Sequence, residues 1–465
     1  MFRKVKIIAT IGPASSSQDS ISSLIEAGVN VFRVNFSHLN KKGAIDLVKK
    51  IRLAEKKSDK TVSIMGDLGG PKIRIGPVAP GVVLNKGDII KIVSEQIAGS
   101  KEMISINYPL LLQNLQKGMA IHIGDGVIRL EVEKKFDGGV VARVTAGGPL
   151  ESRKGFSVEG IDPTKFYLSK KDKEDIQTAI EMKMDALAVS FVQTAKDIAL
   201  VRKLLPQKNA PMLIAKIETA AGVKNAETIL DAVDGLMIAR GDLGFSMPME
   251  ELPYIQKRLI QLALHKAKPI ITATQMLESM IYNHLPTRAE VSDVAKAVLD
   301  GTDCVMLSGE TAVGKFPEET VRMMGKIIDA AIPRIAERHF PDEDTIADAV
   351  CASAVSMASL VDAKLICVFT QSGSTAKRVA RYRPLHPILA LSPDRRMLHQ
   401  LNFSWGVCPV IIRDIRDVDQ MIEEGKKASQ NTDIVQLSLG DPFVISAGIP
   451  FGKSGTTNLV LVERI

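Results

Sequence analysis

The feature that most constrains the fold is a series of eight short runs of apolar and β-branched residues, separated by segments with helical periodicity. Runs of this length and composition are typical of parallel strands that are buried on both faces. The eight runs are 6–12, 30–36, 61–67, 186–191, 213–218, 235–240, 269–274 and 304–309. Eight strand–helix units in series predict a (β/α)8 barrel. An open doubly wound sheet is the alternative, because the sequence alone does not show that the sheet closes.

One interval between the predicted strands is far longer than an ordinary βα loop. Residues 69–168 alternate apolar and polar residues between Gly and Asp turns, which indicates an all-β domain. We interpret it as a small β-barrel inserted after the third strand, above the carboxyl ends of the main barrel, where it can act as a lid. The catalytic barrel is then formed by residues 1–68 and 169–333.

The pattern of strands and helices starts again after Pro333. Residues 345–465 contain helical and strand-like runs, with 433–439 among the predicted strands, and they predict a C-terminal α/β domain. The predicted fold class is therefore α/β: a (β/α)8 TIM barrel with an inserted small β-barrel domain and a C-terminal α/β domain.

Composition narrows the functions open to such a chain. The 465 residues include 60 Lys and Arg against 53 Asp and Glu, and the net charge of +7 is not concentrated in one basic run. Aromatic residues are 4% of the chain, a poor supply of stacking surfaces for single-stranded nucleic acid. We therefore expect anionic small molecules as partners, and no nucleic acid.

Cysteine usage and hydropathy indicate the compartment. The four cysteines are widely spaced and form no metal-type or redox motif, which is typical of buried thiols in a reducing compartment. The longest uncharged apolar stretch, 349–361, is shorter than the roughly 18 residues that span a bilayer. The amino-terminal segment lacks the apolar run of a signal peptide. We expect a soluble cytoplasmic protein with no membrane partner.

Polar residues lie at the carboxyl ends of several predicted strands, which is the end where a (β/α)8 barrel carries its active site. They are Arg33, Asn35 and Ser37 on the second strand, Asp67 on the third, Lys216 and Glu218 on the fifth, 239–244 after the sixth, Thr272 and Thr274 on the seventh, and 308–311 after the eighth. Each alone has a structural interpretation as an interior salt bridge, a helix cap or a solvated arginine. Together they favour a ligand site, since unpaired buried charges are costly.

The residue types at this rim indicate one kind of chemistry. Glu218 and Asp242 offer hard oxygen ligands suited to Mg²⁺, which completes its coordination with substrate oxygens and water. Lys216 and Arg33 add positive charge, and Gly241 with the residues after it can present backbone N–H groups to an anion. Such a set predicts a site for a phosphorylated carboxylate, in which charge stabilisation does most of the work.

Nine long motifs occur in an order that matches one known family. They are TIGPAS (10–15), RVNFSH (33–38), DLGGPKIR (67–74), RKG (153–155), IAKIET (214–219), ARGDLG (239–244), TATQMLESM (272–280), PTRAEVSDVA (286–295) and DGTDCVMLSGETA (300–312). Through these motifs the whole chain resembles the pyruvate kinase family. The resemblance implies a glycolytic phosphotransferase that converts phosphoenolpyruvate and ADP into pyruvate and ATP.

The resemblance also implies roles for residues at the rim. Lys216 is expected to stabilise the charge of the phosphoryl group in transit, and Arg33 to hold the substrate phosphate. Backbone amides of Gly241 and Asp242 would hold the substrate carboxylate, with Thr274 near the proton delivered to the enolate carbon. The implied ligands of Mg²⁺, or of Mn²⁺ in its place, are Glu218 and Asp242.

The nucleotide contacts implied by the resemblance come from two parts of the chain. They are Asn35, Phe36, Ser37, His38, Arg74 and Lys154, the last reaching in from the inserted domain. The sequence 156–160 beside Lys154 reads FSVEG where the family often has VNLPG, and Gln193 stands where an arginine is common. The departure at 156–160 affects the nucleotide site more than the barrel rim.

One further departure concerns a monovalent cation. Many family members have a glutamate where this chain has Lys72, and they depend on K⁺. The positions implied for that ion are Asn35, Ser37, Asp67 and Leu68. An ammonium group at Lys72 can supply the positive charge itself and would repel K⁺. We therefore predict that Lys72 replaces K⁺ and that activity is K⁺-independent; the alternative is that Lys72 points to solvent.

The last domain carries a loop that matches a family site for phosphorylated allosteric effectors. Its hydroxyl residues Thr370, Ser372, Ser374 and Thr375 lie at a predicted helix start, where hydroxyl and N–H groups can bind phosphate. Simple helix capping is the alternative. The resemblance also implies a homotetramer. Two other functions remain open: a metal-dependent aldolase or lyase acting on pyruvate or its enolate, and a non-catalytic sensor.

Overall fold

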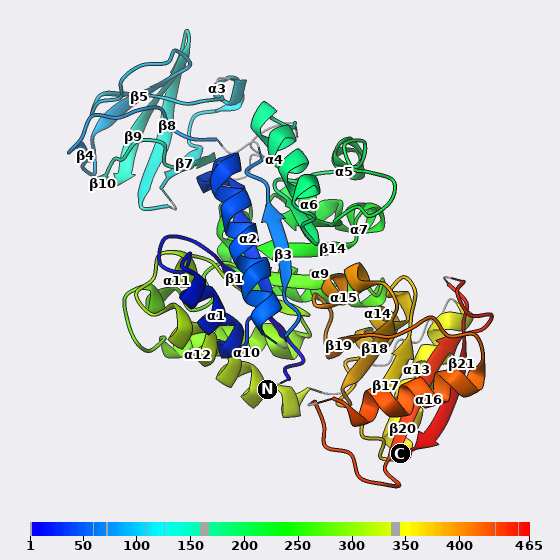
Figure 1. The fold of residues 1–465 in the computed structure, drawn as a ribbon. Coiled ribbons are helices and arrows are strands. Elements are labelled where there is room, and N and C mark those ends of the chain that lie inside the picture. Colours follow the sequence, from blue (N-terminus) through cyan, green and yellow to red (C-terminus); the bar gives the residue numbers. More distant parts are fainter. Residues whose placement is uncertain are drawn as a thin grey trace.

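The computed structural model describes residues 2–58, 60–70, 73–108, 110–124, 126–158, 167–335, 345–432, 434–453 and 455–465. Its centre is a closed barrel of eight parallel strands, in the order β1-β16-β15-β14-β13-β12-β3-β2 (Figure 1). The strands are β1 (Lys6–Thr10), β2 (Val31–Asn35), β3 (Ser63–Asp67), β12 (Ala186–Val189), β13 (Met212–Ile217), β14 (Gly235–Ala239), β15 (Ile270–Ala273) and β16 (Cys304–Leu307). All eight predicted strands are confirmed, and closure of the sheet excludes the open doubly wound alternative.

Helices cover the outside of the barrel. They are α1 (Gln18–Ala27), α2 (Lys41–Lys57), α4 (Lys170–Glu181), α5 (Ala195–Arg202), α6 (Ala220–Lys224), α7 (Ala226–Ala232), α8 (Arg240–Ser246), α9 (Leu252–His265), α10 (Arg288–Asp300), α11 (Gly309–Ala312) and α12 (Pro317–Ala331), with short 3₁₀ turns η1 (Phe36–His38), η2 (Met249–Glu251), η3 (Glu278–Ile281) and η4 (Ile332–Arg334). Capping boxes begin α4, where Ser169 pairs with Asp172, and α10, where Thr287 pairs with Glu290. Each box satisfies backbone N–H groups that a helix start leaves without partners.

The barrel has two apolar layers. The larger lies between the strands and the surrounding helices. The smaller fills the barrel interior and includes Ile8, Met65, Met237 and Met306. Phe403 belongs to this interior cluster and is fully buried, although it comes from the C-terminal part of the chain. The amino end of the barrel is therefore closed by a side chain from another domain.

The insertion after β3 is all-β apart from one short helix, as expected from its alternating sequence. Its elements are β4 (Val83–Leu84), β5 (Ile89–Val93), β6 (Met103–Ser105), α3 (Leu110–Asn114), β7 (Ala120–Ile123), β8 (Ile128–Phe136), β9 (Gly139–Ala146), β10 (Gly148–Pro149) and β11 (Phe156–Val158). Within the described residues these strands pair as a six-stranded sheet, β11-β7-β8-β9-β5-β6, and a separate β10-β4 ladder. Residues 73–76 join the two edges of this sheet and so close the small barrel predicted for the domain. The Ile75 N–H donates to the Lys154 carbonyl beside β11 at 3.0 Å, and the Gly76 N–H donates to the Ser105 carbonyl of β6 at 2.8 Å.

The C-terminal part forms an α/β layer. Its elements are α13 (Ile346–Leu360), β17 (Ile366–Phe369), α14 (Ser374–Arg381), β18 (Ile388–Ser392), α15 (Arg395–Leu401), β19 (Val407–Ile411), α16 (Val418–Gln430), β20 (Pro442–Gly448) and β21 (Thr457–Arg464). The sheet order is β19-β18-β17-β20-β21, and only β21 runs antiparallel to its neighbour. The strand predicted at 433–439 is wrong, since residues 434–439 have no strand and the sheet instead contains β20, between β17 and β21.

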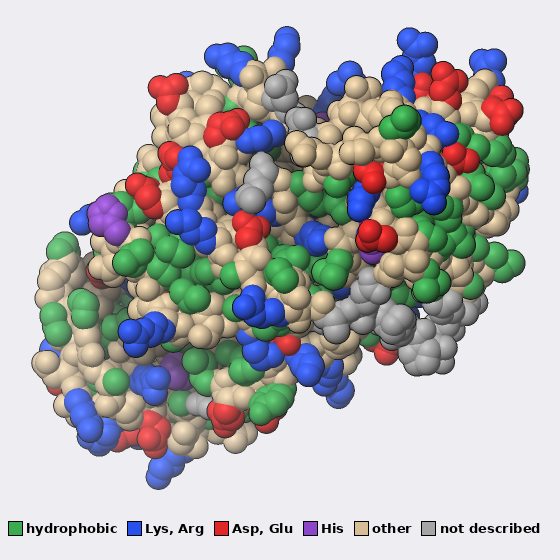
Figure 2. All heavy atoms as spheres, turned by 90° about the horizontal axis from the view of Figure 1, so that it is seen from below, with side chains coloured by type: hydrophobic (Ala, Val, Ile, Leu, Met, Phe, Trp, Pro, Cys, Tyr) green, Lys and Arg blue, Asp and Glu red, His purple; other side chains and the backbone are tan. Residues whose placement is uncertain are grey.

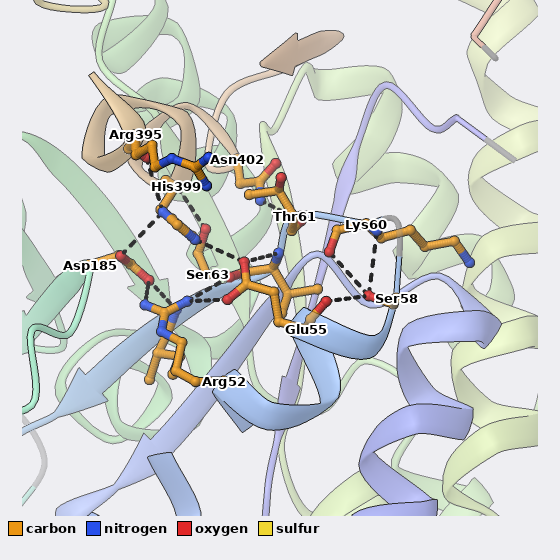
Figure 3. Close-up of polar contacts among 12 residues, drawn as sticks. Arg52, Glu55, Ser58, Lys60, Thr61, Ser63, Asp185, Arg395, His399 and Asn402 are labelled. Carbon is orange, nitrogen blue, oxygen red and sulfur yellow. Dashed lines mark hydrogen bonds and ion pairs between the residues drawn. The ribbon is translucent and has the colours of Figure 1, made fainter. Parts of the chain in front are cut away.

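A polar cluster joins the amino end of the barrel to α15 (Figure 3). Arg52 Nη2 lies 2.6 Å from Asp185 Oδ2, and Glu55 Oε1 lies 2.8 Å from His399 Nε2. Ser63 Oγ donates a 2.6 Å hydrogen bond to the His399 carbonyl. These contacts connect α2, the start of β3 and the segment before β12 to the C-terminal domain.

A second, more deeply buried pair lies in the same seam. Arg383 Nη2 is 2.7 Å from Asp303 Oδ2 and also donates to the Gly301 carbonyl at 2.8 Å. Asp303 Oδ1 accepts the Trp405 backbone N–H at 2.8 Å. The arginine and aspartate side chains are nearly inaccessible to solvent, so their charges depend on each other.

On the outer surface, basic and acidic side chains are interspersed over the face shown in Figure 2. This face has no stripe of basic residues of the kind that binds nucleic acid. None of the helices in the described ranges is long and apolar enough to cross a membrane.

Candidate functional site

The carboxyl end of the barrel brings together the charged residues predicted at the ends of β2, β3 and β13. Arg33 pairs in register with Met65 on β3, and Lys216 pairs with Met237 on β14. Alternation along each strand turns Arg33 and Lys216 toward the same end of the barrel interior as Asp67, the last residue of β3.

Asp67 is the centre of this cluster. Its Oδ2 lies 2.6 Å from Arg33 Nε, and its Oδ1 lies 3.2 Å from Lys216 Nζ. Burial alone would raise the pKa of Asp67, but the charges of Lys216 and Arg33 outweigh burial, and the pKa is lower than usual. Asp67 is therefore ionised and holds both cations in place.

Lys216 lies between two carboxylates. Its ammonium is 3.0 Å from Glu218 Oε1 as well as 3.2 Å from Asp67 Oδ1, and it donates to Ser190 Oγ at 2.7 Å. Burial alone would lower the pKa of Lys216, but Asp67 and Glu218 outweigh it and raise the pKa. A buried, permanently charged ammonium group therefore faces this end of the barrel.

Glu218 has one occupied and one available oxygen. Its Oε2 accepts the Phe191 backbone N–H at 2.7 Å. Its buried Oε1 lacks a hydrogen-bond partner among the described residues, although the Lys216 ammonium lies within ion-pair distance. Burial raises the pKa of Glu218, and the nearby charge of Asp242 adds to that rise while Lys216 opposes it. A cation at this oxygen would satisfy it.

The residues present fit a divalent cation of the Mg²⁺ type. Glu218 and Asp242 supply carboxylate oxygens, one of them the buried Oε1 atom without a hydrogen bond. Mg²⁺ commonly takes one or two protein carboxylates and leaves its other positions to water and phosphate oxygens. No group of three or more His, Cys, Asp or Glu within the described ranges offers a complete protein cage for a metal.

Gly241 and Thr274 meet at the ends of β14 and β15. The Gly241 backbone N–H donates to Thr274 Oγ1 at 2.7 Å, and this hydroxyl donates to the Ala273 carbonyl at 2.6 Å. Thr274 has a φ of 69°, in the left-handed region that a β-branched residue rarely adopts. An amide, a hydroxyl and a strained backbone thus come together beside the charged cluster.

Two residues predicted at this rim are structural instead. Thr272 Oγ1 is fully buried and bonds Thr302 Oγ1 at 3.0 Å. Glu310 is buried and accepts the backbone N–H groups of Leu277 at 3.1 Å and Ser308 at 2.7 Å. The positive φ at Thr274 breaks the strand alternation, so Thr272 and Thr274 do not share a face.

The residues implied for nucleotide binding lie on two parts of the molecule. Asn35 to His38 follow β2, where Asn35 Oδ1 accepts the Ser37 N–H at 3.1 Å and the Phe36 side chain is 1% exposed. Arg74 and Lys154 are neighbours on the inserted domain. Arg74 Nη1 donates to the Arg153 carbonyl, and Lys154 Nζ lies 2.9 Å from Glu151. The Phe36 ring packs in the core, so only its backbone is available to a ligand.

The four positions implied for a monovalent cation lie close together at the ends of β2 and β3. Asn35 and Asp67 are register partners, and a Cβ on Gly69 would lie 3.0 Å from Ser37 Oγ. The Leu68 carbonyl accepts a hydrogen bond from Ser190 Oγ at 2.7 Å. Lys72, the expected replacement for K⁺, lies outside the described residues.

The effector loop predicted in the last domain borders a cavity that is open to solvent. All four predicted hydroxyl residues, Thr370, Ser372, Ser374 and Thr375, line it, together with Arg413 and Lys453. Thr375 Oγ1 is buried against Thr457 Oγ1 at 2.7 Å, whereas Ser372 is exposed. Arg413 and Lys453 were missed in the sequence because they lie far from the loop along the chain.

Ser190 is a further residue that sequence reasoning missed at the barrel rim. It accepts from Lys216 and donates to the Leu68 carbonyl, both at 2.7 Å. Its place near the carboxyl end of the fourth predicted strand, 186–191, was the available signal. Arg240 lies in the predicted rim segment 239–244, but sequence reasoning gave it no role of its own.

Comparison with known proteins gives matches over the whole chain. The family model "Pyruvate kinase, barrel domain" matches residues 2–321, and "Pyruvate kinase, alpha/beta domain" matches residues 348–463. A pyruvate kinase of Geobacillus stearothermophilus is 41% identical over 100% of this chain and 81% of its own length. One of Methylorubrum extorquens is 38% identical, and one of Mycobacterium tuberculosis is 40% identical; each alignment covers 100% of this chain, with 98% and 99% of the relative.

Proposed function

This chain belongs to the pyruvate kinase family, and we propose that the cluster at its barrel rim carries out that family's phosphoryl transfer. In that reaction the phosphoryl group of phosphoenolpyruvate passes to ADP and gives pyruvate and ATP. The observation that carries the proposal is the pairing of Asp67 with both Arg33 and Lys216 beside the buried Glu218. It supplies two fixed cations next to a carboxylate oxygen without a hydrogen bond.

Arg33 and Lys216 act on the phosphoryl group through charge. A phosphoryl group in transit has negative charge spread over its equatorial oxygens, so the protein contributes placed cations rather than a nucleophile. Asp67 fixes Arg33 by the 2.6 Å contact and keeps Lys216 protonated. Arg33 binds the phosphate of the substrate, and Lys216 stabilises the group as it leaves the enol oxygen.

Glu218 and Asp242 hold Mg²⁺, for which Mn²⁺ can substitute. The metal supplies positive charge to phosphoryl oxygens when it is bound. The chain's own contribution is to keep the Glu218 carboxylate oriented by the 2.7 Å hydrogen bond from Phe191.

Gly241, Asp242 and Thr274 handle the other end of the substrate. Backbone N–H groups at Gly241 and Asp242 receive its carboxylate, which replaces Thr274 Oγ1 as acceptor of the Gly241 N–H. The released Thr274 hydroxyl then lies near the enolate carbon, where a proton must arrive to form pyruvate.

ADP binds between the barrel and the inserted domain. Residues Asn35 to His38 contribute from the barrel, with Phe36 acting through its backbone. Arg74 and Lys154 contribute from the inserted domain, where Lys154 exchanges its ion pair with Glu151 for the nucleotide phosphates. Closure of this domain as a lid would remove water that could hydrolyse the phosphoryl donor.

The enzyme works without K⁺. The support is that Asp67, one of the positions implied for the ion, is already neutralised by Arg33 and Lys216, and that Lys72 follows five residues later. Initial rates with K⁺ and with Na⁺ at equal ionic strength should agree within about twofold. A large activation by K⁺ would refute this part of the proposal.

Regulation and assembly follow the family. The cavity lined by Thr370, Ser372, Ser374, Thr375 and two basic residues suits a phosphorylated effector. Exposed apolar side chains after β14 and β15, at Met249, Tyr254, Tyr282 and Leu285, support association into a homotetramer. The four free thiols suit the cytoplasm. Sedimentation and effector titration test these points.

One assay tests the central proposal. Purified protein is mixed with phosphoenolpyruvate, ADP and Mg²⁺, and both ATP and pyruvate are measured. Equal, ADP-dependent formation of the two products supports phosphoryl transfer. A parallel sample is supplied with pyruvate. Consumption of that pyruvate without formation of ATP would indicate the aldolase or lyase alternative, and no turnover in either sample would indicate a sensor.

A further inference from the structure

The turn after β15 is strained at two successive residues. Thr274 has a φ of 69° and Gln275 a φ of 54°, and neither is glycine. Side chains make this left-handed region costly, so two such residues in a row persist only where surrounding contacts hold them. The proposed function uses the first of these residues, so the contacts that hold the turn bear on the reaction.

Arg240 is the side chain that holds this turn. Its Nη2 donates to the Thr274 carbonyl at 2.8 Å and to the Gln275 carbonyl at 3.3 Å. Its Nη1 lies 2.6 Å from the nearer carboxylate oxygen of Asp293 on α10. The arginine side chain is only 12% exposed. The planar, multi-donor guanidinium can serve two carbonyls and a carboxylate at the same time, which an ammonium on a flexible stem does less well.

Gly241, the residue after Arg240, contacts the turn from a second direction. Gly241 follows Arg240 in the chain, and its backbone N–H donates to Thr274 Oγ1 at 2.7 Å. The Arg240 side chain therefore fixes the Thr274 carbonyl, while the next backbone amide meets the Thr274 hydroxyl. This double contact ties the end of β15 to the start of α8.

We infer that Arg240 is a positioning residue that holds the strained Thr274–Gln275 turn and so places the Thr274 hydroxyl beside the substrate. The inference rests on the proposed function, in which Thr274 and Gly241 meet the substrate. Asp293 orients the guanidinium from α10 and acts one step further from the reaction. Without the hydrogen bonds of the Arg240 guanidinium, the turn relaxes toward ordinary φ values and carries the Thr274 hydroxyl away from the Gly241 amide.

The test compares Arg240→Lys and Asp293→Asn with Arg52→Lys as the matched control. Arg52 makes a similar fork at the opposite end of the barrel, donating to the Val62 carbonyl at 3.0 Å and pairing with Glu55 and Asp185 (Figure 3). For each variant kcat, KM for phosphoenolpyruvate, KM for ADP and Tm are measured in the presence of Mg²⁺.

Arg240→Lys is expected to lower kcat by about 100-fold, the size of effect that a misplaced group near the reaction can have. KM for ADP should stay within about twofold, because the proposed nucleotide contacts lie on other elements. Asp293→Asn should lower kcat by a smaller factor, about 5-fold, because an amide can still accept a hydrogen bond from the guanidinium. Arg52→Lys should lower Tm and leave kcat within about twofold.

Three results would overturn the inference while leaving the proposed function intact. They are an active wild type with Arg240→Lys within about threefold in kcat, a rise in KM for ADP that matches the loss in kcat, or an equal loss of kcat in Arg52→Lys. Failure of the wild type to form ATP would overturn the proposed function and the inference with it. If Arg240→Lys does not fold, Asp293→Asn with unchanged kcat is the result that contradicts the inference.

Discussion

The two ends of the barrel use charged residues in opposite ways. At the amino end, the Arg383–Asp303 pair is 2.7 Å apart, and that carboxylate also accepts backbone N–H groups, including that of Trp405. At the carboxyl end, Lys216 and Asp67 are also paired, yet a buried Glu218 oxygen has no hydrogen bond among the described residues and Thr274 has a positive φ. Both Asp303 oxygens are thus hydrogen-bonded within the protein, whereas Glu218 keeps one oxygen that a ligand would use. The difference lies in the carboxylates, since Arg383 also has a positive φ and Trp405 Nε1 is also buried without a hydrogen-bond partner among the described residues.

This contrast explains why similar ion pairs deserve different interpretations. A buried pair with both partners hydrogen-bonded to backbone holds domains together. A pair whose cation also contacts a carboxylate with one unbonded oxygen can accommodate the charge of a bound ligand. Variants at the two ends of the barrel test this contrast.

Lys216→Met should lower kcat by about 10³-fold or more, because the transferred phosphoryl group loses its fixed cation, while substrate affinity changes little. Turnover is measured by ATP formation and affinity by calorimetric titration. Lys268→Met is the control, since this lysine donates to the Leu230 and Val233 carbonyls at 2.6 and 2.8 Å, away from the rim. Near-normal kcat in Lys216→Met would contradict the catalytic role of the rim.

Arg383→Met should cost about 3 kcal/mol of unfolding free energy, because it leaves the Asp303 carboxylate buried without its cation. The kcat of the folded fraction should be unchanged. Urea unfolding at a fixed protein concentration measures the first quantity, and an assay of the same sample measures the second. A large loss of kcat with normal stability would remove the distinction between the two ends.

Glu218→Gln should weaken Mn²⁺ binding by about 10- to 100-fold, because a charged oxygen ligand becomes a neutral amide. Binding is followed directly with the metal alone, so the result does not depend on turnover. Glu55→Gln changes a carboxylate at the amino end and serves as the control. Equal loss of Mn²⁺ affinity in both variants would argue against a metal site at Glu218.

The smallest effect concerns pH and the seam at His399. Burial lowers the pKa of His399, but the hydrogen bond to Glu55 and the charge of Asp185 outweigh burial and Arg52, and the pKa is raised above its usual 6.5. The stabilisation is therefore fully present below about pH 6.5 and is lost as pH rises through the raised pKa. Tm should fall over that range, and less steeply in His399→Gln. An identical slope in the variant would mean that His399 does not contribute.

The sequence predicted the barrel well because its strands carry strong local signals. Each strand is a continuous apolar run, and strand alternation places the polar side chains of Arg33, Asp67 and Lys216 at the carboxyl end of the barrel. The strand expected at 433–439 was wrong because a short apolar run alone does not show whether it pairs, and β20 supplies that strand of the sheet. The closure of the inserted domain by residues 73–76 likewise depends on pairing between distant segments.

The candidate site was predictable only in part for the same reason. Lys216, Glu218 and Asp242 were found because they follow predicted strands. Arg240 was missed as a separate residue because its partners, Thr274 and Asp293, lie 34 and 53 positions away. Periodicity carries no information about such contacts, and the left-handed turn that they hold has no glycine to mark it.

Through Phe403, the barrel depends on the C-terminal domain for part of its core. Because a ring from the C-terminal domain completes the packing inside the barrel, removing that domain would leave unfilled space in the interior cluster that also contains Ile8, Met65 and Met237. A barrel expressed alone would therefore lose part of its apolar core as well as its contacts with the C-terminal domain. The sequence divides the chain into a barrel and a C-terminal domain. The two domains should nevertheless unfold as one cooperative unit, because the barrel needs Phe403 to complete its core.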